Sequence, residues 1–254
     1  MGVLEYIRIL ICDVDGTILD KDFPLGARSK KAVRELQDKG LGVTLATGRN
    51  EWEARQVVQE LRLTLPVILA NGAQIYDFHK EQLIYSQRIK NLDVMEFLGD
   101  YADLSGSVSW YDGADWQTLA IGQFFKKCND LVLKRILVDL PAEINMKSSC
   151  GSPFWVFRNG TSRYELTPKS AHKGQGLQHL CRILGILARD TVAIGNDSND
   201  LSLLESAGIG LAVGDGLASL KKKADGVLVP LREEPIVAVA KWLLGELAWE
   251  DLVF

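Results

Sequence analysis

The residues with the clearest chemical potential are Asp13 and Asp15, which follow the largely apolar run of residues 7–12. Such a run predicts a strand buried on both faces, as in a parallel sheet. Residues at i and i+2 of an extended chain project to the same side, and Gly16 then permits a turn that other residues resist. Neighbouring carboxylates repel, so one is protonated or a cation lies between them. The pattern therefore predicts a polar site at the end of a strand.

Two other interpretations of this segment compete with a catalytic site. A strand followed by a solvated Asp-Gly turn is common in proteins of every kind. Asp-x-Asp-Gly also opens calcium-binding loops, but Thr17 and the apolar pair Ile18-Leu19 do not continue the calcium pattern. A calcium loop is therefore disfavoured, and the choice between turn and site depends on the rest of the chain.

Composition excludes several classes of function. The chain has 254 residues and a formal net charge of −4, and its longest basic run is Lys221–Lys223, so nucleic acid is not an expected partner. No apolar stretch is long enough to span a bilayer, and the N-terminus lacks a signal-peptide pattern, so we expect a cytoplasmic protein without a membrane partner. The four cysteines and three histidines show no spacing typical of zinc, redox or Ser-His-Asp sites.

Strands are expected to alternate with helices in the two ends of the chain. Apolar periodicity predicts strands at 7–12, 41–46, 67–70, 191–195 and 210–213, and helices near 28–39, 54–61 and 174–186. This order predicts an α/β fold with a doubly wound, Rossmann-like parallel sheet. A further helix is expected in the C-terminal segment 242–254.

The middle of the chain is richer in aromatic residues and reads as an inserted α+β cap domain. We expect strands at 107–111, 118–124 and 154–157, and helices near 91–102 and 127–139. The expected division is a core of residues 1–80 and 166–254 and a cap of residues 81–165. The segment 165–168 is expected to end the strand that returns the chain to the core.

Every polar cluster of the core is expected at the carboxyl end of a strand, where open parallel sheets bind ligands. These clusters are Asp13 with Asp15, Thr47-Gly48-Arg49, Asn71, and residues 196–200, and Lys173 at a helix start can reach them. Any one of them, such as Thr47 or Ser198, is also a plausible helix cap. Their joint occurrence after several strands predicts one shared pocket.

The combination suits phosphoryl transfer. The carboxylate of Asp13 can attack phosphorus and hold it as an acyl phosphate. Asp15 can protonate the leaving oxygen and then accept a proton from water. Mg²⁺ would relieve the repulsion between the carboxylates, Thr47 offers a hydroxyl to a phosphoryl oxygen, and Lys173 supplies a positive charge. Backbone N–H groups of residues 14–16 can hold the remaining oxygens.

Taken together, these motifs resemble the haloacid dehalogenase superfamily of phosphatases, most closely its Cof-type sugar-phosphatase branch with a type IIB cap. The resemblance rests on Asp-Val-Asp-Gly-Thr at 13–17, Thr-Gly-Arg at 47–49, Asn-Gly-Ala at 71–73, Glu-Leu-Thr-Pro-Lys at 165–169, His-Lys-Gly at 172–174 and the stretch 207–225. It covers nearly the whole core, whereas the cap fits by position and size.

One position departs from the family pattern. The family's fourth motif usually reads Gly-Asp-x-x-Asn-Asp, but this chain has Asn196 at the first Asp. The resemblance implies a metal site of Asp13, Asp15, Asn196 and Asp200. Asp200 or Asp197 would compensate for the negative charge that Asn196 lacks. We expect magnesium to bind more weakly than it would with a carboxylate at position 196. The resemblance also implies that Asn199 contacts the substrate's phosphate, beside Gly48, Arg49 and Asn71, although Arg49 has the alternative of pairing with a carboxylate.

The expected function is that of a Mg²⁺-dependent phosphomonoesterase acting on small phosphorylated metabolites, foremost sugar phosphates, as a monomer or homodimer. The cap would choose the leaving group, and Trp110, Tyr111, Trp116 and Trp155 are candidates to stack on a sugar, or else part of the cap core. Alternatives are a phosphatase of an osmolyte pathway (phosphorylated glyceride) or of 2-phosphoglycolate. A different class is a non-hydrolytic sensor of a phosphorylated metabolite, which Asn196 alone favours.

Overall fold

The computed structural model describes residues 6–147, 151–159 and 161–253, so Cys150 lies outside the described residues. The chain forms two compact units. The first extends to Tyr85 and resumes at Ala171, and the second comprises Ser86–Ser170. Each boundary therefore lies five residues beyond the one expected from the sequence. Among the described residues, no helix combines the length and the apolar character needed to cross a membrane.

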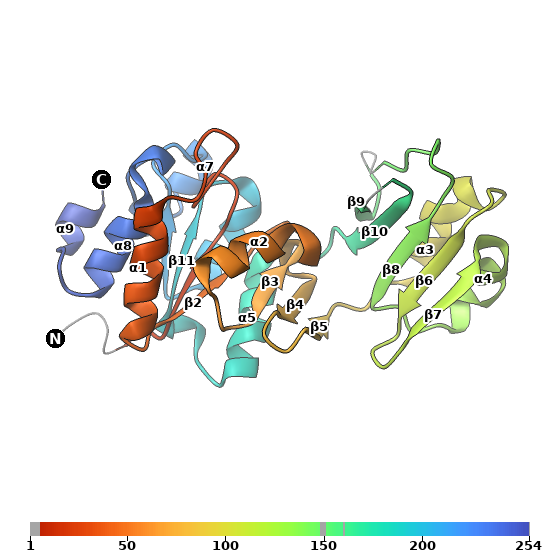
Figure 1. The fold of residues 1–254 in the computed structure, drawn as a ribbon, viewed down its shortest axis with the longest axis horizontal. Helices are drawn as coiled ribbons and strands as arrows, with labels where there is room; N and C mark the ends of the chain where they lie inside the picture. The colour runs from red at the N-terminus through yellow and green to blue at the C-terminus, as the bar shows by residue number, and fades with distance from the viewer. Residues whose placement is uncertain (1–5, 148–150, 160, 254) are drawn as a thin grey trace. The chain divides into compact units, whose positions relative to one another are not determined.

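The first unit is built on five parallel strands in the order β13-β12-β11-β1-β2 (Figure 1). The strands are β1 (Ile9–Cys12), β2 (Gly42–Leu45), β11 (Thr191–Gly195), β12 (Ile209–Ala212) and β13 (Gly226–Val227). Both neighbours of β1 run parallel to it, and the chain moves outward from β1 in opposite directions through β2 and through β11–β13. The predicted doubly wound parallel sheet is confirmed, with its switch point at β1.

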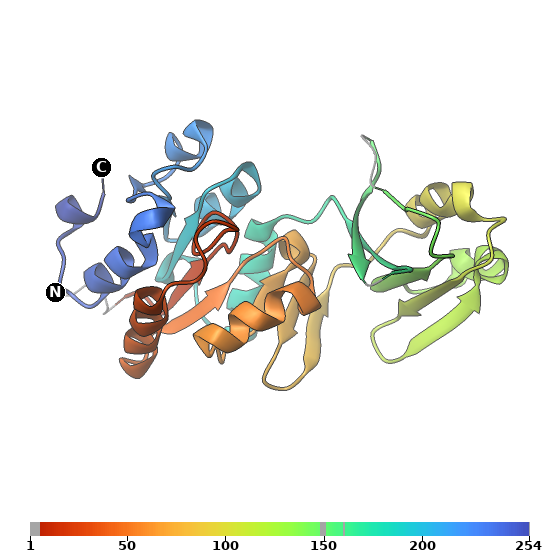
Figure 2. The same cartoon turned by 45° about the horizontal axis from the view of Figure 1, so that its top comes forward.

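Helices cover both faces of this sheet, as Figure 2 also shows. On one face α1 (Ala27–Asp38), α2 (Glu51–Leu61) and α8 (Pro235–Leu243) pack against a core that includes Leu10 and Cys12. On the other, α5 (Lys173–Leu184), α6 (Leu201–Ser206) and α7 (Ala218–Lys221) pack against Ile9 and Ile11. Successive residues of β1 thus enter opposite layers, which explains why that strand reads as an apolar run.

Two details of the first unit differ from the sequence prediction. The strand β3 (Val67–Leu69) pairs antiparallel with β4 (Gln74–Asp77), which continues to β5 (Gln82–Ser86) in a three-stranded sheet. A single parallel bridge, Ala46 to Ile68, links β3 to the end of β2. The expected terminal helix at 242–254 is the end of α8 and a separate α9 (Trp249–Leu252), because Gly245 with φ +75° ends the first.

The second unit is an antiparallel sheet in the order β7-β6-β8-β10-β9. Its strands are β6 (Ser107–Tyr111), β7 (Trp116–Ala120), β8 (Arg135–Asp139), β9 (Phe154–Asn159) and β10 (Arg163–Pro168). The helices α3 (Asn91–Leu98) and α4 (Ile121–Lys127) pack on one face of it. The helical layer and the antiparallel sheet agree with the predicted α+β insert.

Three predicted elements of this unit are wrong. The helix expected at 127–139 is instead a short 3-10 turn, Cys128–Asp130, followed by the central strand β8. The strand expected at 118–124 ends at Ala120, where α4 begins. The segment 165–168 belongs to β10 of this sheet and not to the core. Short apolar runs such as Ile136–Val138 fit either a strand or a buried helix, so pairing partners far along the chain decide.

Candidate active site

Asp13 lies at the carboxyl-terminal edge of the parallel sheet, as the residue that directly follows β1. Its backbone N–H donates to the carbonyl of Ile194 at 2.9 Å, which continues the pairing with β11. The chain then turns sharply, because the Val14 carbonyl accepts from the N–H groups of residues 17, 18 and 19, and Gly16 adopts φ +80°. The turn holds the Asp13 side chain at 5% exposure. Thr17 donates its hydroxyl to Asp13 Oδ2 at 3.1 Å.

Lys173 brings a positive charge to this carboxylate from the first residue of α5. Its side chain is fully buried, and Nζ donates to Asp13 Oδ1 at 2.6 Å and to Asp200 Oδ1 at 2.5 Å. A lysine at a helix N-terminus opposes the helix dipole, and its burial costs solvation. The two carboxylates offset both costs. Lys173 therefore lies beside Asp13, which is 160 positions earlier in the chain, and beside Asp200, which is 27 positions later. The sequence predicted that Lys173 could reach these clusters.

Asp200 is buried beneath the loop that follows β11. Its Oδ2 accepts from the backbone N–H groups of Asn196 at 2.9 Å and Asp197 at 3.0 Å, while Oδ1 faces Lys173. Gly195 makes room for it, since a Cβ there would lie 2.5 Å from the Asp200 Cβ. Both carboxylate oxygens therefore already have partners, and the expected metal-ligand role of Asp200 stays a prediction.

Three oxygens converge on the side chain of Asn196. In the orientation that satisfies its hydrogen bonds, the amide Nδ2 donates to the main-chain oxygen of Asp15 at 3.0 Å, to Thr17 Oγ1 at 3.0 Å and to Asp13 Oδ2 at 3.1 Å. Thr17 is the residue that sequence reasoning missed, although its position four residues after Asp13 could have pointed to it. Within the described residues, no three His, Cys, Asp or Glu side chains form a cluster suited to a metal ion.

Asp15 and Arg49 form a separate ion pair. Arg49 Nη2 and Nε donate to the two oxygens of Asp15 at 2.6 and 2.9 Å, and the Asp15 side chain is 58% exposed. The repulsion expected between Asp13 and Asp15 is therefore relieved by two different cationic side chains, Lys173 and Arg49. Of the two roles considered for Arg49, the structure shows the pairing with a carboxylate.

The remaining candidates lie after β2, after β3 and, for Asn199, in the 3-10 turn Ser198–Asp200 that follows β11. Thr47 is fully buried, and its Oγ1 accepts from the backbone N–H of Arg49 at 3.1 Å. Asn71 adopts a left-handed conformation with φ +53°, and its Oδ1 accepts from Asn199 Nδ2 at 3.0 Å. A Cβ at Gly48 would lie 3.3 Å from Asn71 Oδ1. The structure thus brings Gly48, Asn71 and Asn199 side by side.

Burial and charge set the protonation of the central groups. Burial raises the pKa of the Asp13 carboxyl to about 6, although the charge of Lys173 opposes this and that of Asp200 adds to it. Burial lowers the pKa of Lys173, but Asp13 and Asp200 outweigh it, so the net pKa is raised and the ammonium stays charged. Burial, with the charge of Asp13, also raises the pKa of Cys12, which keeps this thiol protonated.

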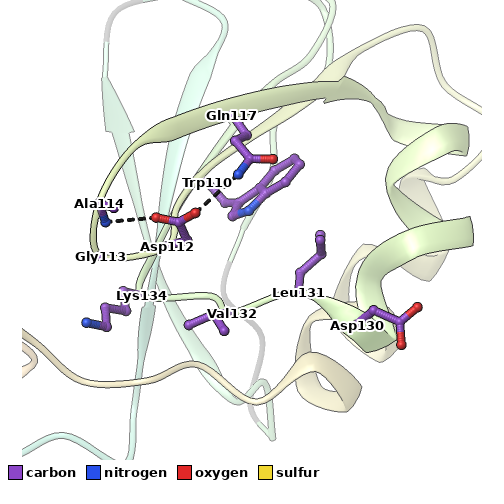
Figure 3. Close-up of a pocket in the computed structure, with 9 residues that line it drawn as sticks. All are labelled: Trp110, Asp112, Gly113, Ala114, Gln117, Asp130, Leu131, Val132 and Lys134. Atoms are coloured by element: carbon purple, nitrogen blue, oxygen red, sulfur yellow. Dashed lines mark hydrogen bonds between the residues drawn. The ribbon is translucent and has the colours of Figure 1, made fainter.

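The second unit contains a hollow of about 470 Å³ near the β6–β7 turn (Figure 3). Its polar wall includes Asp112, which accepts from the N–H of Ala114 at 2.8 Å and from Gln117 Nε2 at 3.1 Å. Leu131 and Val132 supply apolar surface. The hydrogen bonds of Asp112 stabilise the turn between β6 and β7. We assign the hollow no catalytic role.

Several known proteins resemble this chain in sequence. A family model described as haloacid dehalogenase-like hydrolase matches residues 10–131 and 124–240. The chain is 29% identical over 235 residues to the HMP-PP phosphatase of Cronobacter sakazakii, covering 84% of this chain and 86% of that protein. It is 23% identical over 252 residues to the 5-amino-6-(5-phospho-D-ribitylamino)uracil phosphatase YcsE of Bacillus subtilis, covering 94% and 96%.

A solved structure shares the fold. The crystal structure of a haloacid dehalogenase-like hydrolase from Bacteroides thetaiotaomicron superposes with a TM-score of 0.64 at 23% identity, and the match covers 92% of this chain and 98% of that one.

Proposed function

The chain belongs to the haloacid dehalogenase-like hydrolase family and is a phosphatase of its Cof-type branch, and from this premise we propose a magnesium-dependent phosphomonoesterase that uses Asp13 as nucleophile. The observation that carries the proposal is the buried Lys173 ammonium between Asp13 and Asp200. It keeps a carboxylate in place for attack and offers positive charge to the phosphoryl oxygens.

The proposed reaction has two steps. An Asp13 oxygen forms a bond to phosphorus while the bond from phosphorus to the leaving oxygen breaks, and Asp15 gives that oxygen a proton. In the second step, a water oxygen forms a bond to phosphorus while the bond from phosphorus to Asp13 breaks, and Asp15 accepts a proton from that water. Phosphate then leaves, and both aspartates are back in their starting states. For this role Asp15 would carry a proton and would have to leave its ion pair with Arg49, and its exposure gives it access to substrate and water. Gly48, Asn71 and Asn199, which lie together, would hold the phosphate.

The oxygens around Asn196 fit a magnesium ion by their chemistry. Carboxylate, main-chain carbonyl and hydroxyl oxygens are hard donors of the kind Mg²⁺ prefers. Asp13 Oδ2 and the Asp15 carbonyl would hold it, together with the amide oxygen of Asn196 once that amide turns. When bound, the ion would neutralise charge on the phosphate. Asp200 would support the site through Lys173 and the 196–197 backbone.

We propose small phosphorylated metabolites in the cytoplasm as substrates, with sugar phosphates first, and a monomer or homodimer as the active form. The second unit would act as the cap that selects the leaving group. Two of its tryptophans are exposed enough to stack on a sugar, since Trp116 is 46% and Trp155 44% exposed. Trp110 is buried in the core of the unit and serves packing instead. The glyceride and phosphoglycolate alternatives concern the same chemistry with another leaving group.

The test is an assay of phosphate release from a panel of sugar phosphates, glycerol phosphate and 2-phosphoglycolate. We expect turnover with Mg²⁺, loss of turnover in EDTA, and recovery on adding excess Mg²⁺. The panel ranks the three substrate classes by kcat/KM. Saturable binding of these compounds without turnover at any magnesium concentration would contradict the proposal and favour the non-hydrolytic sensor.

The raised pKa of Asp13 predicts an acidic limb in the pH profile. Asp13 attacks as the anion, so kcat/KM should fall as the pH drops through about 6. More magnesium should move the limb to lower pH, because a nearby cation favours the charged carboxylate. The measurement uses an aryl and an alkyl phosphate with different second pKa values. The pH at which kcat/KM falls should be the same for both substrates. If it shifts with the second pKa of the substrate, the assignment of the acidic limb to Asp13 is contradicted.

A further inference from the structure

The position occupied by the Asn196 amide nitrogen has the surroundings of a cation. Three oxygens from residues 13, 15 and 17 lie 3.0–3.1 Å from it, and one of them belongs to a carboxylate. The amide is also closely confined, because a Cβ at Gly16 would lie 2.2 Å from its nearer terminal atom. The Thr17 hydroxyl donates to Asp13 Oδ2, so the two hydrogens of the NH₂ group are enough to give the other two oxygens a donor.

A carboxylate at position 196 would behave in the opposite way. It would add a fourth oxygen with a further negative charge to the same cluster, and a bound cation or a proton would be needed to hold the four together. With Asn196 the cluster is satisfied without any ion. The same hydrogen bonds must break before the amide oxygen can turn toward a metal.

We propose that Asn196 is an internal substitute for the cation: its Nδ2 holds the Asp13–Thr17 turn in the metal-free protein, and its amide turns when a divalent ion binds. The inference rests on the magnesium site of the proposed function. It goes further by stating that the Asp13–Thr17 turn has its final shape before any metal binds. Metal binding should consequently add little to the stability of this chain.

The test compares Asn196→Asp with Ser198→Asp, which adds the same charge at an exposed position of the same loop. Titration calorimetry with Mg²⁺ should show at least about tenfold tighter binding for Asn196→Asp than for wild type. Ser198→Asp should stay within about twofold of wild type. In EDTA, Asn196→Asp should unfold at a lower temperature than wild type, and Mg²⁺ should raise its Tm by more than it raises the wild-type Tm.

A third variant and a spectrum separate the possible outcomes. Asn196→Ala should lose stability in EDTA like Asn196→Asp but should not regain it with Mg²⁺. In NMR spectra of the wild type, the side-chain NH₂ signals that Asn196→Ala removes should shift on adding Mg²⁺. Equal stability of all variants in EDTA, or unchanged NH₂ signals, would overturn the inference. Failure of the proposed function would appear separately, as wild-type protein that binds Mg²⁺ but releases no phosphate.

Discussion

Replacing Asp13 with asparagine is expected to lower kcat for phosphate release by at least about 10⁴-fold. The amide has nearly the same shape, so the hydrogen bonds to Lys173 and Thr17 have a partner of the same size. It cannot, however, attack phosphorus or form an acyl phosphate. Single-turnover experiments with acid quench should find a phosphorylated peptide containing residue 13 in the wild type and none in Asp13→Asn.

Asp22→Asn provides the matched control for this change. It makes the same carboxylate-to-amide exchange at an exposed position a few residues later in the chain. We expect kcat within about twofold of wild type, as for surface substitutions in general. Asp13→Asn protein that retained a tenth of the wild-type kcat would rule out Asp13 as the nucleophile.

Replacing Lys173 with methionine is expected to lower kcat by about 10³-fold and to destabilise the first unit. The catalytic loss follows from removing a preorganised positive charge beside the transferred phosphoryl group. The change also leaves the carboxylates of Asp13 and Asp200 buried without their cation, which should cost about 3–5 kcal/mol of unfolding free energy. Denaturant titration and steady-state kinetics measure the two effects.

A double variant separates catalysis from folding. Lys173→Met with Asp200→Asn removes one of the two uncompensated charges, so its unfolding free energy should recover in part. Its kcat should stay low, because no cation faces the phosphate. Recovery of kcat together with stability would mean that Lys173 serves only to hold the fold.

The convergence of the candidate residues was predictable because parallel strands end at the same edge of a sheet. Asp13, Thr47 and Asn196 each follow a strand whose apolar run is readable in the sequence, and β2 and β11 are the two direct neighbours of β1. The roles of individual side chains are harder to predict, because they depend on which partner each one meets. The Asp15 carboxylate pairs with Arg49, and no spacing rule encodes that choice.

The second unit was predicted less accurately for a physical reason. Its central strand β8 pairs antiparallel with β6 and β10, and neither is joined to it by a short hairpin turn, so β8 carries no local signal of its neighbours. Residues 131–139 mix apolar and charged positions in a way that fits a helix as well as a strand. Burial of Ile136 and Val138 under α3 and α4 decides in favour of the strand.

The start of α5 is held by contacts of backbone with backbone. A Cβ at Gly174 would lie 2.2 Å from the Ser202 carbonyl oxygen, and one at Gly176 would lie 2.9 Å from the Cα of Gly72. At Gly72 itself, a Cβ would lie 2.2 Å from the carbonyl oxygen of His172. All of these atoms belong to the first unit. Under the proposed function, natural variation or laboratory recombination of the inserted unit would alter which esters are accepted while Lys173 keeps its place, so new specificities would arise without rebuilding the chemical step.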